Sequence, residues 1–264
     1  MPLSRFLRPL GAAVLCLALS ACETTGHGKL GESKASKEQD AIETRVALGK
    51  AYMQQGKYEV ALENLQKALD RDSNSVDAHT VIAVLYERIG NTKAAEQHYA
   101  RAAELAPKSG DTNNNYGQFL CATGRYDEAQ KYYARAMEDP FYKTPGMLYA
   151  NAGTCLADHG GDAQLGHAEQ YLRKALEVDP NNALALYYIA RVLYTKNDFF
   201  HARAFIQRFE ALGKPDPAAL LLARNIEVKL GHDVSARDYA QRLHKDFPDS
   251  EQTRSLDSVT PSAQ

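Results

Sequence analysis

Four cysteines are the side chains of this sequence whose chemistry depends most on spacing. Cys16 and Cys22 lie in the first 22 residues, whereas Cys121 and Cys155 lie in the middle of the chain, 34 residues apart. No C-x-x-C pair with the spacing of a zinc site is present, so the cysteines do not predict a metal centre. Two thiols can form a disulfide only if the fold brings residues 34 apart in sequence next to each other.

Sequence patterns typical of catalysis are missing. The chain has no H-E-x-x-H, no phosphate-binding G-x-x-x-x-G-K-[ST] loop and no G-x-S-x-G. His159 and His167 lie near Asp158 and Asp162, but a Gly-rich segment separates the histidines, and they do not predict a metal site. The paired carboxylates lie in segments expected to be helical, where they have the character of ordinary charges in contact with water. We therefore predict that the protein is not an enzyme, with no catalytic residue, no metal, no cofactor and no small-molecule substrate.

A period of 34 residues runs through most of the chain. Six alanines are separated by intervals of 34, 34, 39, 34 and 34 residues: Ala61, Ala95, Ala129, Ala168, Ala202 and Ala236. A column of mostly large side chains follows them: Leu65, Tyr99, Tyr133, Leu172, Ile206 and Ala240. A column of small residues precedes them: Gly49, Ala83, Gly117, Gly153 and Ala190. Short side chains let two helices approach closely, and large ones fill the space beside them.

Residues that end helices recur between these columns: Gly56, Gly90, Gly124, Gly160, Gly161, Asn197 and Gly231. Glycine and asparagine tolerate the left-handed conformation that terminates a helix. Prolines mark the boundaries between units, where a helix cannot continue: Pro107, Pro140, Pro180, Pro215 and Pro248. The pattern therefore predicts pairs of helices joined by tight turns.

The period and its columns resemble the tetratricopeptide repeat (TPR) family, whose unit is a helix–turn–helix of this length. The resemblance implies an all-α fold, a TPR superhelical solenoid of about six helix–turn–helix repeats over residues 42–250. The repeats are expected at 42–75, 76–109, 110–143, 146–182, 183–216 and 217–250. Of the five extra residues in the long interval, two are expected between repeats three and four and three in the turn of repeat four, within 160–166. The chain departs from the family in having no Trp.

Residues 1–22 have the pattern of a secretory signal peptide. Arg5 and Arg8 precede an apolar run, at 10–18, that is too short to span a bilayer. Leu19-Ser20-Ala21-Cys22 then resembles a bacterial lipobox. This resemblance implies cleavage before Cys22 and attachment of acyl chains such as palmitate there; an ordinary signal with a chance cysteine is the alternative. Glu23 rather than Asp follows, which among Gram-negative lipoproteins favours the outer membrane.

The segments at the two ends of the solenoid are polar. Residues 23–38 are expected to form a flexible tether with a typical reach of roughly 20–24 Å. Residues 251–264 are expected to form a disordered tail.

The net charge of −2 becomes −4 when Arg5 and Arg8 are removed with the signal peptide. Such a mild charge argues against nucleic acid as a partner and against strong attraction to anionic lipid.

Because the solenoid is expected to be exported, the sequence predicts how Cys121 and Cys155 are paired. Both fall in the first helices of their repeats, and one step of the solenoid brings them near each other. Disulfides persist outside the cytosol, so we predict a Cys121–Cys155 disulfide. Two buried free thiols are the alternative, because a two-residue insertion shifts the register of the pair.

In TPR solenoids the first helix of each unit lines the concave surface. By resemblance, the exposed inner positions are Val46, Lys50, Met53, Gln54, Thr80, Val84, Glu87, Arg88, Asn114, Asn115, Gln118, Asn151, Thr154, Tyr187, Arg191 and Tyr194. The amides of Asn115 and Asn151 can pair with a peptide backbone, or else brace neighbouring helices. Val46, Met53 and Val84 are predicted to form an apolar opening for a partner helix or strand, with packing inside the repeat as the alternative.

Two segments narrow the resemblance further. They read Asn114-Asn115-Tyr116-Gly117-Gln118-Phe119-Leu120-Cys121 and Asn151-Ala152-Gly153-Thr154-Cys155. With the lipobox and the repeat layout, they look like the type IV pilus biogenesis and stability lipoproteins, the PilF/PilW pilotin family. The resemblance implies a lipid-anchored single solenoid on the periplasmic face of the outer membrane. It implies binding to the pilus secretin, assistance with its localisation and oligomerisation, and support of pilus biogenesis and twitching motility.

Other functions stay open from the sequence. The protein is expected to be monomeric, because no long apolar stripe demands a dimer. A TPR lipoprotein subunit of outer-membrane β-barrel assembly has the same layout, as does a lipoprotein regulator of peptidoglycan synthesis. An enzyme is the alternative from a different class, for which the sequence offers no site.

Overall fold

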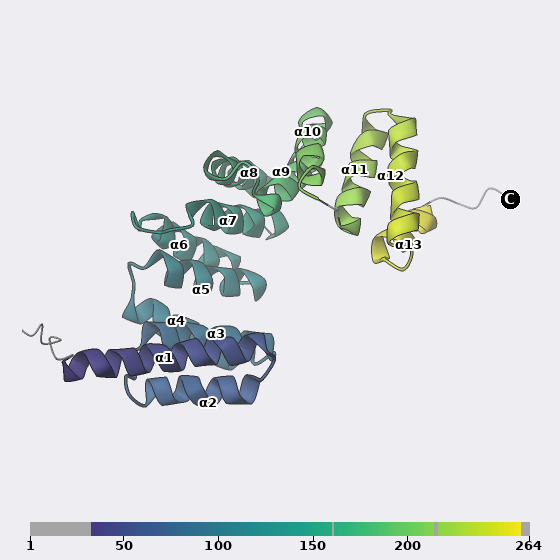
Figure 1. Cartoon of the computed structure of the whole chain (residues 1–264). Coiled ribbons are helices and arrows are strands. Elements are labelled where there is room, and N and C mark those ends of the chain that lie inside the picture. The colour runs from purple at the N-terminus through teal and green to yellow at the C-terminus, as the bar shows by residue number, and fades with distance from the viewer. Residues whose placement is uncertain (1–32, 160, 214–215, 260–264) are drawn as a thin grey trace, which may run out of the picture.

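The computed structural model describes residues 33–159, 161–213 and 216–259. In this part of the chain there are 13 helices and no strand. Twelve of them form successive hairpins that stack in chain order into a curved array (Figure 1). In order they are α1 (Lys34–Gln54), α2 (Tyr58–Leu69), α3 (Val76–Arg88), α4 (Thr92–Leu105), α5 (Gly110–Ala122), α6 (Tyr126–Met137), α7 (Pro145–His159), α8 (Gly161–Val178), α9 (Ala183–Thr195), α10 (Phe199–Glu210), α11 (Pro217–Lys229), α12 (Asp233–Asp246) and α13 (Glu251–Val259).

The repeated small and large residues pack as their columns predict. All six periodic alanines are buried on the second helix of a hairpin. A Cβ placed on Gly117 of α5 would lie 2.9 Å from the ring of Tyr133 on α6. A Cβ on Gly153 of α7 would lie 2.8 Å from Cγ of Leu172 on α8. The helices of a hairpin therefore approach closely where the first one carries no side chain, and the all-α solenoid is confirmed.

The turns within the hairpins end in left-handed residues. Gly90 has φ 77° and Asn197, the non-glycine member of the set, has φ 61°. After Gly90, the N–H of Asn91 donates to the carbonyl of Tyr86 at 2.8 Å, which closes the end of α3. Asn91 then accepts from the N–H of Ala94 and caps the start of α4. A few residues thus stop one helix and start the next.

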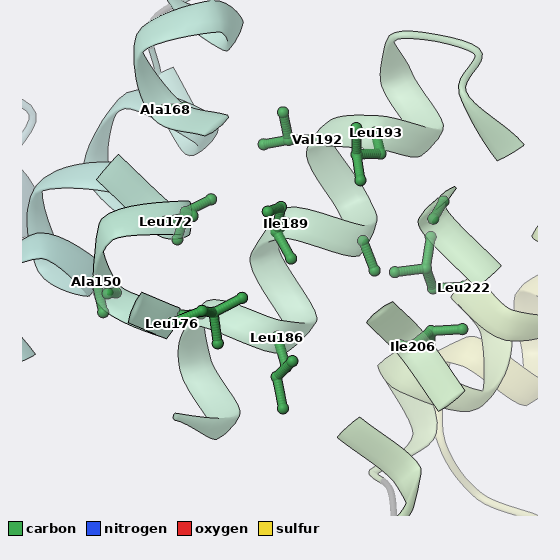
Figure 2. Packing of buried hydrophobic residues seen from close by; sticks show 14 of the residues in the cluster. Ala150, Ala168, Leu172, Leu176, Leu186, Ile189, Val192, Leu193, Ile206 and Leu222 are labelled. Atoms are coloured by element: carbon green, nitrogen blue, oxygen red, sulfur yellow. The ribbon is translucent and has the colours of Figure 1, made fainter. Parts of the chain in front are cut away.

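The core runs between neighbouring hairpins rather than around one centre. Figure 2 shows apolar side chains of four successive helices, which bury one another: Leu172 and Leu176 of α8, Leu186, Ile189, Val192 and Leu193 of α9, Ile206 of α10, and Leu222 of α11. Because each hairpin buries its apolar face only against the next, stability is spread along the array.

Both polar end segments contain helix that the sequence did not predict. Residues 34–38, expected in the flexible tether, belong to α1, because Ser33 accepts the N–H of Ser36 and caps the helix. Residues 251–259, expected in the disordered tail, form α13. Thr253 and Leu256 are buried, and the Thr253 hydroxyl donates to the Phe247 carbonyl at 2.7 Å. α13 therefore covers the exposed end of the last hairpin.

The three-residue insertion also differs from its prediction. Residues 161–166, expected in a longer turn, are helical and lengthen α8 to 18 residues. α8 begins seven residues before Ala168, whereas α6 begins three residues before Ala129. Leu165 is buried, so this added helical turn is anchored by apolar contact.

Residues 1–32 lie outside the described part of the chain, and so do the predicted signal peptide, the lipidation site Cys22 and most of the tether. Among the described helices, none is long and apolar enough to cross a membrane.

Candidate partner-binding surface

A groove lies between α1 and α3, at the amino-terminal end of the solenoid. It encloses about 340 Å³ and is lined by Lys50, Met53, Gln54, Asp77, Thr80, Val81, Val84 and Arg88. Six of the predicted inner positions are thus brought together: Lys50, Met53, Gln54, Thr80, Val84 and Arg88. Their spacing explains this, since residues three, four and seven apart share one face of a helix.

The groove combines an apolar floor with charged edges. Met53 and Val81 are buried and Val84 is half-buried, so they present apolar surface without being fully open to solvent. Lys50 and Arg88 supply positive charge and Asp77 negative charge, all on exposed side chains. The Thr80 hydroxyl donates to the Val76 carbonyl at 2.8 Å and is already engaged. The arrangement suits a segment that is apolar along one side and polar along the other.

Val46 does not lie in this groove. Its side chain is only 4% exposed and packs in the core shared by α1, α2 and α3. Ile42, Val46, Gly49 and Met53 follow helical spacing along one buried stripe of α1. Met53 ends the stripe with 8% exposure, so it lines the groove from below rather than projecting into it. The prediction of Val46 as an exposed binding residue is therefore wrong.

Asn151 is also not available to a peptide. It is buried, and its Nδ2 donates to Oδ1 of Asn114 at 3.1 Å. The amide thus braces α7 against α5, which is the alternative that the sequence left open. Asn115 is half-buried and Gln118 is exposed, and neither lines the groove.

Glu87 is exposed but does not line the groove. Its carboxylate accepts the hydroxyl of Tyr99 at 2.7 Å, which joins α3 to α4. Burial, together with this carboxylate, raises the pKa of the Tyr99 hydroxyl. Glu87 is therefore a structural partner of Tyr99 in this fold.

Tyr187 and Arg191 lie on α9, three hairpins beyond the groove. Arg191 pairs with the carboxylate of Asp158, and its guanidinium lies over the ring of Tyr188, 4.5 Å from the centroid. The Tyr188 hydroxyl donates to the same carboxylate at 3.0 Å. The ring of Tyr187 is half-buried against Phe209. These two predicted residues form a separate polar and aromatic surface.

Cys121 and Cys155 are joined as a disulfide between α5 and α7, with their Cα atoms 5.9 Å apart. Cys155 is buried. No cluster of three or more metal-ligating side chains is found within the described residues. His159 instead stacks on the ring of Tyr126, with centroids 3.8 Å apart.

Two groove residues were missed from the sequence, Asp77 and Val81. Both lie on α3 one helical turn before a residue that was predicted, Val81 and Asp77 preceding Val84 and Thr80 by three positions. Helical spacing alone was the signal that pointed to them.

Comparisons with known proteins agree with this architecture. Two tetratricopeptide repeat models match the chain, one over residues 46–110 and 158–218 and the other over 90–140. The helix hairpins, their period and these matches define the chain as a tetratricopeptide repeat protein.

Similar proteins and solved structures identify a narrower group than the repeat models do. The type IV pilus assembly protein PilF of Pseudomonas aeruginosa is 29% identical over 238 residues, which cover 90% of this chain and 92% of PilF. The crystal structure of PilW, a widely conserved type IV pilus biogenesis factor, matches with a TM-score of 0.76 and 28% identity, covering 83% of this chain and 98% of PilW. A PilF structure matches with a TM-score of 0.76 and 26% identity, covering 85% of this chain and all of that one. The chain is therefore a TPR protein homologous to PilF and similar in structure to PilW and PilF, TPR proteins of type IV pilus biogenesis.

Proposed function

We propose that this protein is a pilotin, an outer-membrane lipoprotein that binds the type IV pilus secretin and assists its localisation and oligomerisation. Pilus biogenesis and twitching motility would then depend on it. The observation that carries the proposal is the groove of α1 and α3, on a solenoid homologous to PilF.

The chemistry of the groove supports a polypeptide partner. An unassembled secretin subunit exposes apolar surface and strand edges, which pair readily with other chains. An apolar floor bordered by Lys50, Asp77 and Arg88 can cover one such segment and hold its polar side at the charged edges. The protein acts in this proposal as a scaffold, with no catalytic step.

The proposed lipid anchor at Cys22 determines where in the cell the groove acts. Acyl chains on this residue would hold the protein at the periplasmic face of the outer membrane, since each buried methylene contributes about 0.8 kcal/mol. Tethering raises the local concentration of the groove at the membrane, so a modest affinity for secretin suffices.

Co-purification from detergent-solubilised envelope tests the proposal. We expect secretin to accompany the wild-type protein, and a deletion strain to lose correctly localised secretin rings. Recovery of a β-barrel assembly subunit or a peptidoglycan synthase in place of secretin would support one of the alternative functions. Normal ring formation in the deletion strain would end the pilotin proposal.

A Cys22→Ser variant tests the anchor separately. The variant should leave the membrane fraction and lose its effect on secretin localisation, while purified protein still binds secretin. Continued membrane retention would contradict lipidation at Cys22.

A further inference from the structure

The loop between α6 and α7 presents an aromatic ring to solvent. This seven-residue loop, 138–144, lies between repeats three and four, where the sequence predicts two extra residues. Phe141 at its centre is 87% exposed, more than any other large apolar side chain in the described part of the chain. Contact with water is unfavourable for such a ring, so a second apolar phase that covers it would be favoured.

The loop holds this ring outward through fixed contacts. The Asp139 carboxylate accepts the N–H of Phe141 at 2.9 Å and the N–H of Gly110 at 2.7 Å. The ring of the next residue, Tyr142, packs on Gly110, where an added Cβ would lie 2.6 Å from its Cδ2. The loop is therefore fastened to the start of α5, with the Tyr142 ring turned inward and the Phe141 ring in solvent.

The loop belongs to the edge of the array at which α1 begins. Figure 1 shows the loops that follow α2, α4 and α6 on the side from which α1 starts, and we call this side the loop edge. The turns within the hairpins lie at the opposite edge, about 20 Å away, which is the length of a 13-residue helix. Polar contacts run along the loop edge from α1 to the loop 138–144: Glu38 with Arg71, Asn74 with Arg101, and Gly110 with Asp139.

Further apolar side chains are exposed at the loop edge. Met147 in the first turn of α7 is 54% exposed, and Val178 at the end of α8 is 52% exposed. Val178 packs beside Gly146, the neighbour of Met147, since a Cβ on Gly146 would lie 3.3 Å from its Cγ1. The exposed charges around the loop 138–144 balance one another, so they neither strongly attract nor repel an anionic surface: Lys108, Asp111, Glu138 and Lys143.

The loop edge is also where the chain from the proposed lipid anchor joins the array. Eleven residues, 23–33, separate Cys22 from α1, and even fully extended they span no more than about 40 Å. An anchor at Cys22 therefore keeps the start of α1 within this distance of the bilayer. The bilayer is thus the apolar phase closest to the loop edge.

We propose that the loop edge is a membrane-contact surface, at which the ring of Phe141 enters the interfacial region of the bilayer. Aromatic rings suit this region, and Met147 and Val178 add apolar area at the same edge. The proposal rests on the proposed anchor at Cys22 for its place in the cell, but it does not require secretin as the partner. Contact at this edge would fix the orientation in which the groove of α1 and α3 meets that partner.

The chain contains no Trp, so a single introduced tryptophan reports its own surroundings. The chain that begins at Cys22 is coupled through the Cys22 thiol to a maleimide lipid, while Cys121 and Cys155 are occupied by their disulfide. The vesicles contain three parts phosphatidylethanolamine to one part phosphatidylglycerol, with brominated acyl chains that quench tryptophan inside the bilayer. We expect the emission of Phe141→Trp to shift to shorter wavelength and to be quenched at least twofold.

Phe200→Trp is the matched control. Phe200 is also strongly exposed, but it lies at the start of α10, beside the turn of its hairpin and therefore at the opposite edge. We expect its emission in the same vesicles to stay solvent-like and unquenched. Circular dichroism checks that both variants are folded.

Four outcomes would overturn the membrane contact. They are solvent-like emission from Phe141→Trp, equal quenching of both variants, loss of the quenching in high salt, which would assign the contact to charge, and a blue shift without vesicles that rises with protein concentration, which would assign the ring to a second copy. Chemical coupling makes the result independent of whether cells lipidate Cys22. Membrane retention of Cys22→Ser and co-purification of secretin test the proposed function separately.

Discussion

Asn151 on α7 donates a hydrogen bond from Nδ2 to Oδ1 of Asn114 on α5, across 3.1 Å. Both amides are buried, and the same two helices are joined by the Cys121–Cys155 disulfide. α5 and α7 are therefore linked twice, once by a polar contact and once covalently. The inner face of repeats three and four is fastened there rather than left open for a partner.

Replacing Asn151 with Ala should destabilise the fold by about 1–3 kcal/mol, because it leaves the Asn114 amide buried and unpaired. Urea unfolding measures the loss. Gln118→Ala is the control, since Gln118 is exposed and its loss should cost under about 0.5 kcal/mol. An equal effect of both substitutions would show that the amide pair contributes nothing.

The disulfide should stabilise the protein by about 3–4 kcal/mol, according to the chain-entropy relation for a loop of this length. A Cys121→Ser, Cys155→Ser double variant should show this loss in urea unfolding. Thiol titration of the denatured, non-reduced mature protein checks the bond directly. Two reactive thiols per chain would contradict it.

Gly117→Ala should cost about 1–3 kcal/mol, because the new methyl group would lie 2.9 Å from the Tyr133 ring at the closest approach of α5 and α6. Gly166→Ala is the matched helical control. Nothing lies within 4 Å of a Cβ at Gly166, so this change should raise stability by up to about 1 kcal/mol. Thermal unfolding of the two variants should therefore shift in opposite directions.

A new carboxylate in the groove should weaken binding while leaving the fold intact. Val84→Glu and Lys50→Glu are expected to weaken secretin binding about tenfold or more with native circular dichroism, because both side chains line the groove and neither is fully buried. Gln66→Glu on the exposed side of α2 is the control. Unchanged affinity in both groove variants would refute the assignment.

Met53→Glu is not a useful test of the same surface. Met53 is nearly buried, and a carboxylate there would lose its hydration inside the core of repeats one and two. We expect this variant to be destabilised by several kcal/mol, with binding lost through unfolding.

Stability should fall as the pH drops below about 6.5, because of His98. Burial, reinforced by the neighbouring His79, lowers the pKa of His98 from its ordinary value of 6.5. The unfolded chain then binds a proton more readily than the folded chain, so this contribution is present above pH 6.5 and is lost as the pH falls through the lowered pKa. His98→Gln should flatten the decline below about pH 6.5. An identical pH profile for wild type and variant would contradict this.

The sequence alone determined the all-α solenoid, its hairpins and the pairing of small with large residues. These features depend on side chains at fixed spacing on two adjacent helices, such as Gly117 and Tyr133, and on local turn conformations such as that of Asn197. The same local rules brought Lys50, Thr80 and Val84 to one groove. These local rules act between residues that are close in sequence and recur in every repeat. They can therefore be recognised without knowing how the chain is arranged in three dimensions.

Only the tertiary structure decided which face of each helix stays open. Val46 is buried because α2 and α3 pack on the stripe it shares with Ile42. Asn151 is satisfied by an amide 37 residues away, and the added first turn of α8 is anchored by the buried side chain of Leu165. Burial and hydrogen bonding across hairpins result from helix stacking, which the spacing of residues along one helix does not specify.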